Sequence, residues 1–110
     1  MKTLNRIKKS EDFATTIHKG NSFRLPSFIV HIKKNELSYV RVGISASKKL
    51  GHAVLRNRVK RQVRAMCDDL IKYDAHSLDI VIIVRKDFLD KTFNDNKSQL
   101  CDLFTKQVGL

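Results

Sequence analysis

The sequence predicts an α+β fold, an α/β sandwich in which helices cover a small mixed sheet in the element order α-β-β-α-β-α. Three observations lead to this prediction. Residues 27–32 and 39–47 alternate apolar and polar side chains, as half-buried strands do. Residues 78–84 (L-D-I-V-I-I-V) are almost continuously apolar, which is typical of a central strand. Residues 53–72 have the periodicity of a helix, so the strands on either side of them are expected to be parallel.

Two further helices complete the order. The first is expected over residues 11–19, because Ser10 is a suitable N-cap and Gly20 a suitable stop. The last is expected to begin after a cap within residues 94–96. We find no repeat or linker, so residues 1–110 are expected to form a single domain, with residues 1–9 as a flexible basic arm.

The connections predict how the strands are arranged. Residues 33–36 form a short polar turn, which favours an antiparallel hairpin between 27–32 and 39–47. The parallel strands 39–47 and 78–84 need a crossover through the central helix. Crossovers of this kind are right-handed in nearly all proteins, so the residues themselves predict the right-handed form.

The net charge of +11 is unevenly distributed along the 110 residues. Residues 1–67 contain 16 basic and 3 acidic side chains, whereas residues 68–110 contain 6 basic and 8 acidic ones. Between Leu37 and Cys67 there are eight cations and no carboxylate. A basic surface on one side of a small protein indicates a polyanionic partner.

The central helix concentrates this charge. Its apolar residues fall on one arc of a helix and predict its buried face: Leu55, Val59, Val63, Met66 and Leu70. Beside the arc lie five cations with Asn57 among them: Arg56, Arg58, Lys60, Arg61 and Arg64. No acidic residue lies at the usual i, i+4 spacing. An ordinary solvated face is the alternative, but crowded like charges favour binding to nucleic-acid phosphates.

The second predicted strand and its neighbours are candidates for binding a single RNA strand. Single strands are held by cations along the backbone and by aromatic faces under the bases. Arg41, Ser45 and Ser47 share one strand face, and Lys48 and Lys49 follow it. His31 can join this face and Phe13 can close the groove from the first helix. Phe13 as a core residue and His31 as an inert strand residue are the alternatives.

Other kinds of site find little support. The basic half contains only three carboxylates, too few for acid–base or two-metal nuclease chemistry, so we expect no catalytic residue and no metal ligand in the protein. Cys67 and Cys101 lack metal-binding spacing and are expected to be reduced thiols. No segment approaches 18 apolar residues, and the first residues lack a signal-peptide pattern. We therefore expect a cytoplasmic protein without a membrane partner.

The segment from Ser45 to Arg64, S-A-S-K-K-L-G-H-A-V-L-R-N-R-V-K-R-Q-V-R, resembles the signature of the bacterial ribonuclease P protein subunit. That family has S-V-S-K-K followed by G-x-A-V-x-R-N-R-x-K-R-x-x-R. Further similarity lies in R-I-K-K-S-E-D-F from Arg6, R-V-G-I-S from Arg41 and I-V-R-K from Ile83. The resemblance therefore covers nearly the whole chain.

The resemblance implies a protein cofactor for a catalytic RNA, in a ribonucleoprotein endonuclease that removes the 5′ leader of precursor tRNA. Magnesium would be held mainly by RNA, with no organic cofactor and no obligate protein partner. The R-N-R helix, Arg56 to Arg64, would contact the RNA subunit through Arg56, Asn57, Arg58, Lys60, Arg61 and Arg64. A cleft between the sheet and the first helix would receive the leader, and Phe13, His31, Lys48, Lys49, Arg85 and Lys86 match it. The family's strand–helix–strand crossover is left-handed.

Three residues depart from the family pattern. Ile17 occupies a position where members often have a second aromatic side chain, and His31 one where tyrosine is common. Both departures weaken the expectation that leader bases stack at these positions. Ala46 replaces the usual valine at a core position. The competing functional interpretation is a general RNA-binding or ribosome-associated protein without a role in cleavage; a nuclease acting alone is disfavoured by the missing carboxylates.

Overall fold

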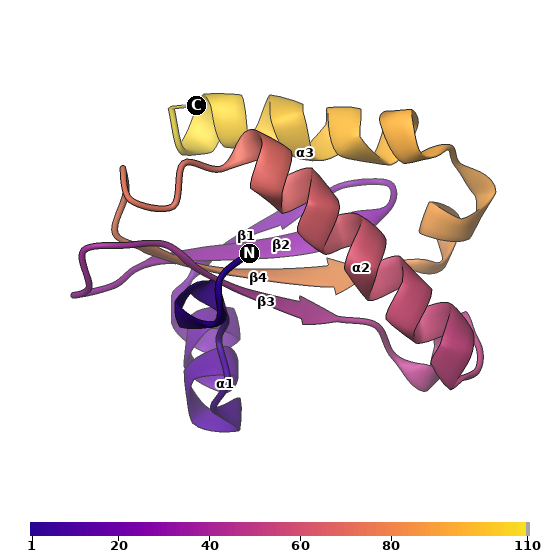
Figure 1. The fold of residues 1–110 in the computed structure, drawn as a ribbon, viewed down its shortest axis with the longest axis horizontal. Helices are drawn as coiled ribbons and strands as arrows, with labels where there is room; N and C mark the ends of the chain where they lie inside the picture. Colours follow the sequence, from indigo (N-terminus) through magenta and orange to yellow (C-terminus); the bar gives the residue numbers. More distant parts are fainter. Residues whose placement is uncertain (110) are drawn as a thin grey trace.

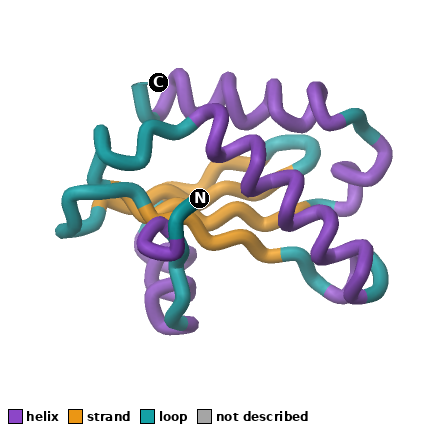
Figure 2. The backbone as a smooth tube through the Cα atoms, in the orientation of Figure 1, coloured by secondary structure: helices purple, strands orange, loops and turns teal. Residues whose placement is uncertain are grey.

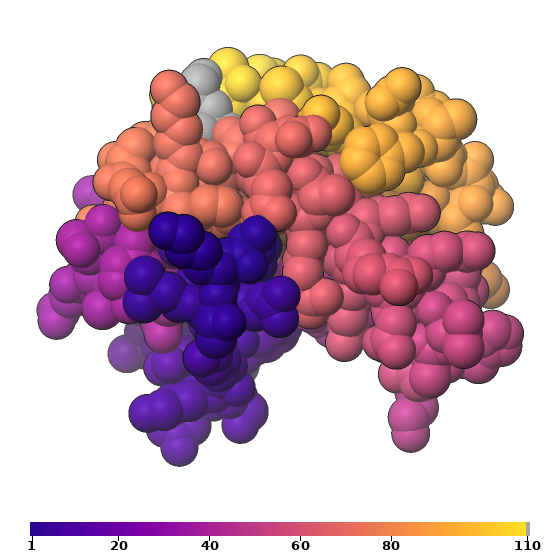
Figure 3. All heavy atoms as spheres, in the orientation of Figure 1, coloured from indigo at the N-terminus to yellow at the C-terminus, as the bar shows by residue number. Residues whose placement is uncertain are grey.

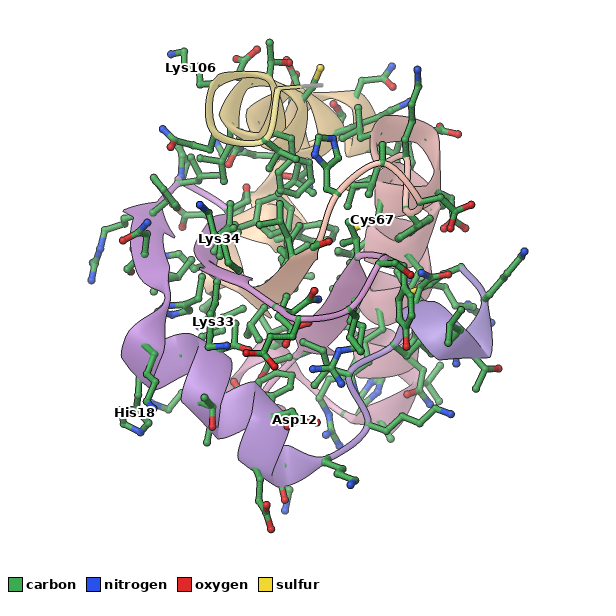
Figure 4. The ribbon with its side chains drawn as sticks, turned by 90° about the vertical axis from the view of Figure 1, so that its left-hand side faces the viewer. Asp12, His18, Lys33, Lys34, Cys67 and Lys106 are labelled. Carbon is green, nitrogen blue, oxygen red and sulfur yellow. The ribbon has the colours of Figure 1, made fainter. Side chains whose placement is uncertain are left out.

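The computed structural model describes residues 1–109, which form a four-stranded sheet with helices on both faces (Figures 1 and 2). The strands are β1 (Asn21–Arg24), β2 (Phe28–Lys34), β3 (Arg41–Ser45) and β4 (Leu78–Val84). The helices are α1 (Ser10–Lys19), α2 (Ala53–Leu70) and α3 (Phe93–Gln107). Helices α2 and α3 cover one face of the sheet and α1 crosses the other, which Figure 4 shows along the strands. The predicted α+β class is confirmed.

The strand order is β1-β2-β4-β3, which differs from the predicted hairpin. β4 lies between β2 and β3, antiparallel to the first and parallel to the second. The predicted limits of β4 and its parallel pairing with β3 are confirmed, whereas direct pairing of β2 with β3 is wrong. β4 takes the central place because five of its seven residues are buried, so it needs cover on both faces. The sequence prediction also missed β1, a four-residue edge strand that is mostly exposed.

The connection from β3 through α2 to β4 is left-handed. Viewed along the direction of the two parallel strands, the chain passes counterclockwise from β3 to α2 and on to β4 (Figures 1 and 4). The right-handed form expected from general preference is therefore corrected, and the form implied by the family resemblance is found.

Several of residues 1–9, which the sequence predicts to form a flexible basic arm, contact the rest of the fold. Residues Thr3–Asn5 form a 3₁₀ turn, and the side chain of Asn5, 3% exposed, donates a hydrogen bond to the carbonyl of Val40 at 2.8 Å. The backbone N–H of Ile7 donates to the carbonyl of Val42 at 3.0 Å. The segment is ordered because it satisfies backbone groups on the open edge of β3.

The hydrophobic core lies between the sheet and the pair α2 and α3. Its fully buried side chains come from the sheet and from both helices: Phe28, Val30, Ile80, Ile82, Val63, Met66, Leu100 and Phe104.

Cys67 and Cys101 are free thiols, and burial raises the pKa of Cys67 to about 12, so this thiol is protonated and unreactive. Helix α3 is capped by Thr92, whose hydroxyl accepts a hydrogen bond from the Asp95 N–H at 3.1 Å, two residues before the predicted range of caps. Within residues 1–109, no helix combines the length and the apolar character needed to cross a bilayer.

Candidate nucleic-acid interface

Helix α2 has one buried face and one cationic face. Val59, Val63 and Met66 are at most 2% exposed, and Leu55 and Leu70 pack against the core, which confirms the predicted apolar arc. The other sides of the helix carry a set of residues that we call the cationic face: Arg56, Asn57, Arg58, Lys60, Arg61 and Arg64. Helical periodicity fixes both faces, because burying the arc leaves these six residues nowhere but the sides and the outside of the helix.

The cations of this face have no carboxylate partners. Across residues 1–109, no ion pair involves any of these five cations. The Nε atom of Arg56 is buried and has no hydrogen-bond acceptor in the protein. Five like charges on about three turns repel one another, and the repulsion is relieved when an external polyanion binds. The cationic face is therefore suited to an anionic partner.

A tight loop joins β3 to this helix. It contains a 3₁₀ turn, Lys48–Leu50, in which Lys48 and Lys49 are exposed while Leu50 is buried and anchors the loop. Gly51 has φ of 147°, and a Cβ there would lie 2.7 Å from Leu55 Cδ2. Only glycine fits this approach without strain, so the loop holds its two lysines beside the first turn of α2.

The opposite face of the sheet is only partly covered by α1. The ring of Phe13 lies directly over Gly43, since a Cβ at Gly43 would be 2.6 Å from Phe13 Cε2. Gly43 pairs with Val81, and Val81 with His31, so this row of the sheet faces α1. Two residues further along the strands lies the row Ser45, Ile83, Ile29 and Arg24. We call this row, which α1 leaves partly exposed, the open row.

The open row lies between α1 and the loop that leads into α2, and we call the space above it the groove. Figure 3 shows an open notch between the N-terminal lobe, in indigo, and the pink segment that leads into α2. Phe13 bounds the row on the side of α1, while exposed Ser47 and Lys48 follow β3 beyond Ser45. Arg85 follows β4, and its Nη1 donates to the carbonyl of Leu25 at 2.8 Å, which holds the guanidinium near the end of β1. The groove thus combines an aromatic edge, hydroxyl groups and cations, the groups that bind a single RNA strand.

Not all of the residues predicted for this groove are equally open. Lys49 and Lys86 are exposed and Arg85 is half-buried. His31 is only 8% exposed, under the face that α1 covers, and its Nδ1 has no hydrogen-bond partner. Burial lowers the pKa of His31 below its ordinary 6.5, so the ring is neutral at pH 7.

Arg41 lies at the other end of the same sheet face and is held by carboxylates. Its guanidinium donates to Asp79 at 2.6 and 2.9 Å, and to Asp12 of α1 at 3.3 Å. The hydrogen bonds to Asp79 raise the pKa of Arg41. Asp79 is 3% exposed, so the pair ties α1 and β4 to β3 and does not point at the open row. Arg41 is better explained as a structural residue than as an RNA contact.

Several carboxylates are engaged with other groups of the protein. In the described part of the chain, no three His, Cys, Asp or Glu side chains come together to hold a metal ion. Asp12 and Asp79 are engaged with Arg41, and Asp68 accepts hydrogen bonds from the Tyr73 hydroxyl and the N-terminal amino group. These carboxylates therefore act as partners of protein cations and hydroxyl groups.

Sequence reasoning missed one member of the open row. Arg24 is exposed on β1 and lies in register with Ile29, next to Ile83 and Ser45. Its four-residue strand has no clear alternation that would have marked it in the sequence. Only the pairing of β1 with β2 brings Arg24 to the groove.

Comparison with known proteins identifies the family. The family model for ribonuclease P matches residues 1–108. The chain belongs to the ribonuclease P protein family. It is 41% identical to the ribonuclease P protein component of Mesoplasma florum, over 96% of this chain and 97% of that protein. It is 40% identical to the Bacillus cereus protein component, over 100% of this chain and 96% of that protein.

Solved structures of the family have the same fold. A Staphylococcus aureus RNase P protein, a mutant with defective mRNA degradation activity, superimposes with a TM-score of 0.83 at 34% identity, covering 93% of this chain and 86% of that one. The Thermotoga maritima RNase P protein gives a TM-score of 0.78 at 30% identity, covering 92% and 96%. The chain is accordingly a protein component of ribonuclease P, the ribonucleoprotein endonuclease of tRNA 5′ maturation, and not a general RNA-binding protein.

Proposed function

We propose that this protein binds two RNA segments on two separate surfaces. The cationic face of α2 binds phosphates of the catalytic RNA subunit. The groove above the open row binds the single-stranded 5′ leader of precursor tRNA. The observation that supports this division is that α2 and α1 lie on opposite faces of the sheet, so the two surfaces are open at the same time (Figure 4).

The leader contacts follow from the residues of the groove. Phe13 stacks on a base, and hydroxyl groups and cations hold the backbone of the strand: Ser45, Ser47, Lys48, Lys49, Arg85 and Lys86. To these we add Arg24. His31 supports the floor of the groove from below, since its ring is 8% exposed. Arg41 fixes α1 in place through Asp12 and Asp79.

Catalysis is assigned to the RNA. Magnesium ions held mainly by RNA would supply the attacking water and stabilise the leaving oxygen, since paired metal ions do this in phosphodiester hydrolysis. The protein's share is to bring the leader and the RNA subunit together and to neutralise their phosphates. We place this work in the cytoplasm.

A reconstitution assay tests the proposal. The purified protein is added to precursor tRNA with and without the RNA subunit at low magnesium concentration. Cleavage at the mature 5′ end is expected only with the RNA subunit, and faster with the protein than without it. Cleavage by rigorously RNA-free protein would refute the assignment of catalysis to RNA.

The groove is tested with Phe13→Ala in the holoenzyme. Stacking contributes about 1–3 kcal/mol per base, so precursor tRNA should bind about 5- to 150-fold more weakly. Mature tRNA has no leader and should bind as before. An equal loss for both ligands, in a variant that circular dichroism shows to be folded, would mean that Phe13 acts only as a packing residue.

A further inference from the structure

A small pocket lined by apolar, polar and cationic side chains adjoins the cationic face of α2. It has a volume of about 250 Å³ and lies between α2, the 3₁₀ turn Lys86–Asp90 and the first turn of α3. Its apolar lining includes Leu55, Val59, Phe88, Leu89 and Phe93. Arg58 and Lys91 also line it, and no carboxylate does.

Two apolar side chains of this pocket are exposed without serving the core. Leu89 and Phe93 are each 39% exposed, and they are two of only four large apolar residues in 1–109 with this degree of exposure. Exposed apolar surface of this kind is unfavourable in water, and a partner that covers it gains binding free energy. The other exposed apolar residues, Leu4 and Val54, do not line the pocket.

Buried residues beneath Leu89 and Phe93 fix the position of these two side chains. Phe88 is 4% exposed and packs edge-on against Phe28, with ring centroids 5.6 Å apart. The side chain of Asn96, 1% exposed, donates to the carbonyl of Phe88 at 3.1 Å and accepts from the Ser27 hydroxyl at 2.6 Å. A buried hydrogen-bonded network of this kind fixes its segment, so Leu89 and Phe93 are presented in one arrangement.

We propose that this pocket receives an unpaired nucleotide of the RNA subunit, with its base against Phe93 and Leu89 and its phosphates beside Arg58 and Lys91. The inference rests on the proposed binding of that RNA to α2, because Arg58 belongs to both surfaces. The chemistry fits, since unstacked bases bind aromatic faces flanked by cations. The volume of about 250 Å³ lies just below the range of about 300–1,000 Å³ found for sites of drug-sized ligands, which favours an occupant as small as one nucleotide. A second copy of the chain is disfavoured, because two surfaces of a protein with net charge +11 repel each other.

The stacking contact is tested by RNA-subunit binding across a salt titration. Phe93→Ala is expected to weaken binding of the transcribed RNA subunit by about 5- to 150-fold, which corresponds to one stacked base. The slope of log affinity against log salt should stay unchanged, because no phosphate contact is lost. The matched control is Leu4→Ala, which removes an exposed apolar side chain outside the pocket and should leave the affinity unchanged.

A fluorescent variant keeps the test decisive if Phe93→Ala is unstable. The chain contains no tryptophan, so Phe93→Trp introduces a single fluorophore that keeps an aromatic ring in the pocket. The RNA subunit should quench its emission by stacking, while Leu4→Trp should show little change. RNA that binds without quenching Trp at position 93 would overturn the inference, as would an emission change that depends on protein concentration without RNA. Wild-type protein that failed to bind the RNA subunit would instead refute the proposed function itself.

Discussion

Gly43→Ala should displace the ring of Phe13 and thereby separate the packing role of this ring from its role in leader binding. The added Cβ would lie 2.6 Å from Phe13 Cε2 and 2.8 Å from Cδ2. Carbon atoms in contact are about 3.5–4.0 Å apart, so the ring must move by about 1 Å. Overpacking of this size costs about 1–3 kcal/mol of unfolding free energy. The displaced ring also ceases to match a base at the edge of the groove.

The expected result is a less stable but folded protein whose holoenzyme binds precursor tRNA more weakly, with unchanged affinity for mature tRNA. Stability is measured by urea unfolding followed by circular dichroism, and affinity by filter binding of both tRNA forms. The loss of precursor affinity should not exceed that of Phe13→Ala, about 5- to 150-fold, because displacement cannot remove more than the whole stack.

A double-mutant cycle provides the control. Leucine at position 13 lacks the outer ring atoms that the new methyl group would meet, so Phe13→Leu with Gly43→Ala should be more stable than the two single losses predict. Single losses that add within about 0.5 kcal/mol would show that the ring does not rest on Gly43. Wild-type stability and wild-type leader binding in Gly43→Ala would refute both the contact and its proposed role.

Three further predictions test the charges. Arg58→Ala with Arg61→Ala should lower the magnitude of the slope of log affinity against log salt for RNA-subunit binding by roughly 0.7–0.9 per lost phosphate contact. Lys106→Ala on α3, remote from the cationic face of α2 (Figure 4), should leave this slope unchanged. Equal slopes for the two variants in a salt titration would refute phosphate binding by the cationic face. Asp79→Asn should cost about 1.5–3 kcal/mol in urea unfolding, because it removes the charge of the buried partner of Arg41 and leaves only the longer contact with Asp12 as an ion pair. Asp69→Asn, which breaks an exposed pair with Lys97, should cost about 0–1 kcal/mol, and similar losses for the two variants would contradict the structural role of the Arg41 pair. The pKa of His31 is lower in the folded than in the unfolded state, so the unfolded state binds more protons below the ordinary value of about 6.5. The contribution of His31 to stability should therefore be complete above that pH and be lost as the pH drops through the folded pKa. The unfolding free energies of wild type and His31→Gln should diverge between pH values above and below 6.5, and parallel curves would exclude a contribution from His31.

The sequence by itself determined the features that depend on local periodicity. The apolar arc of α2 follows from residues three and four apart, so its cationic face was predictable before any contact was known. The apolar run of β4 likewise indicated a central strand with its limits, and the intervening helix required β3 and β4 to be parallel. The R-N-R signature indicated the family because it is a long, ordered string of residues.

Only the tertiary structure decided which side chains from different elements share a surface. Arg41 and Ser45 alternate onto the same strand face and looked equivalent in sequence, yet Asp12 and Asp79 reach only the first. Arg24 joins the groove solely because β1 pairs with β2, and Phe93 lines the same pocket as Arg58 solely because α3 starts beside α2. Local patterns fix the direction in which a side chain points from its own element, whereas strand order, crossover hand and helix placement arise from packing the whole chain at once, and these set the neighbours of each site residue.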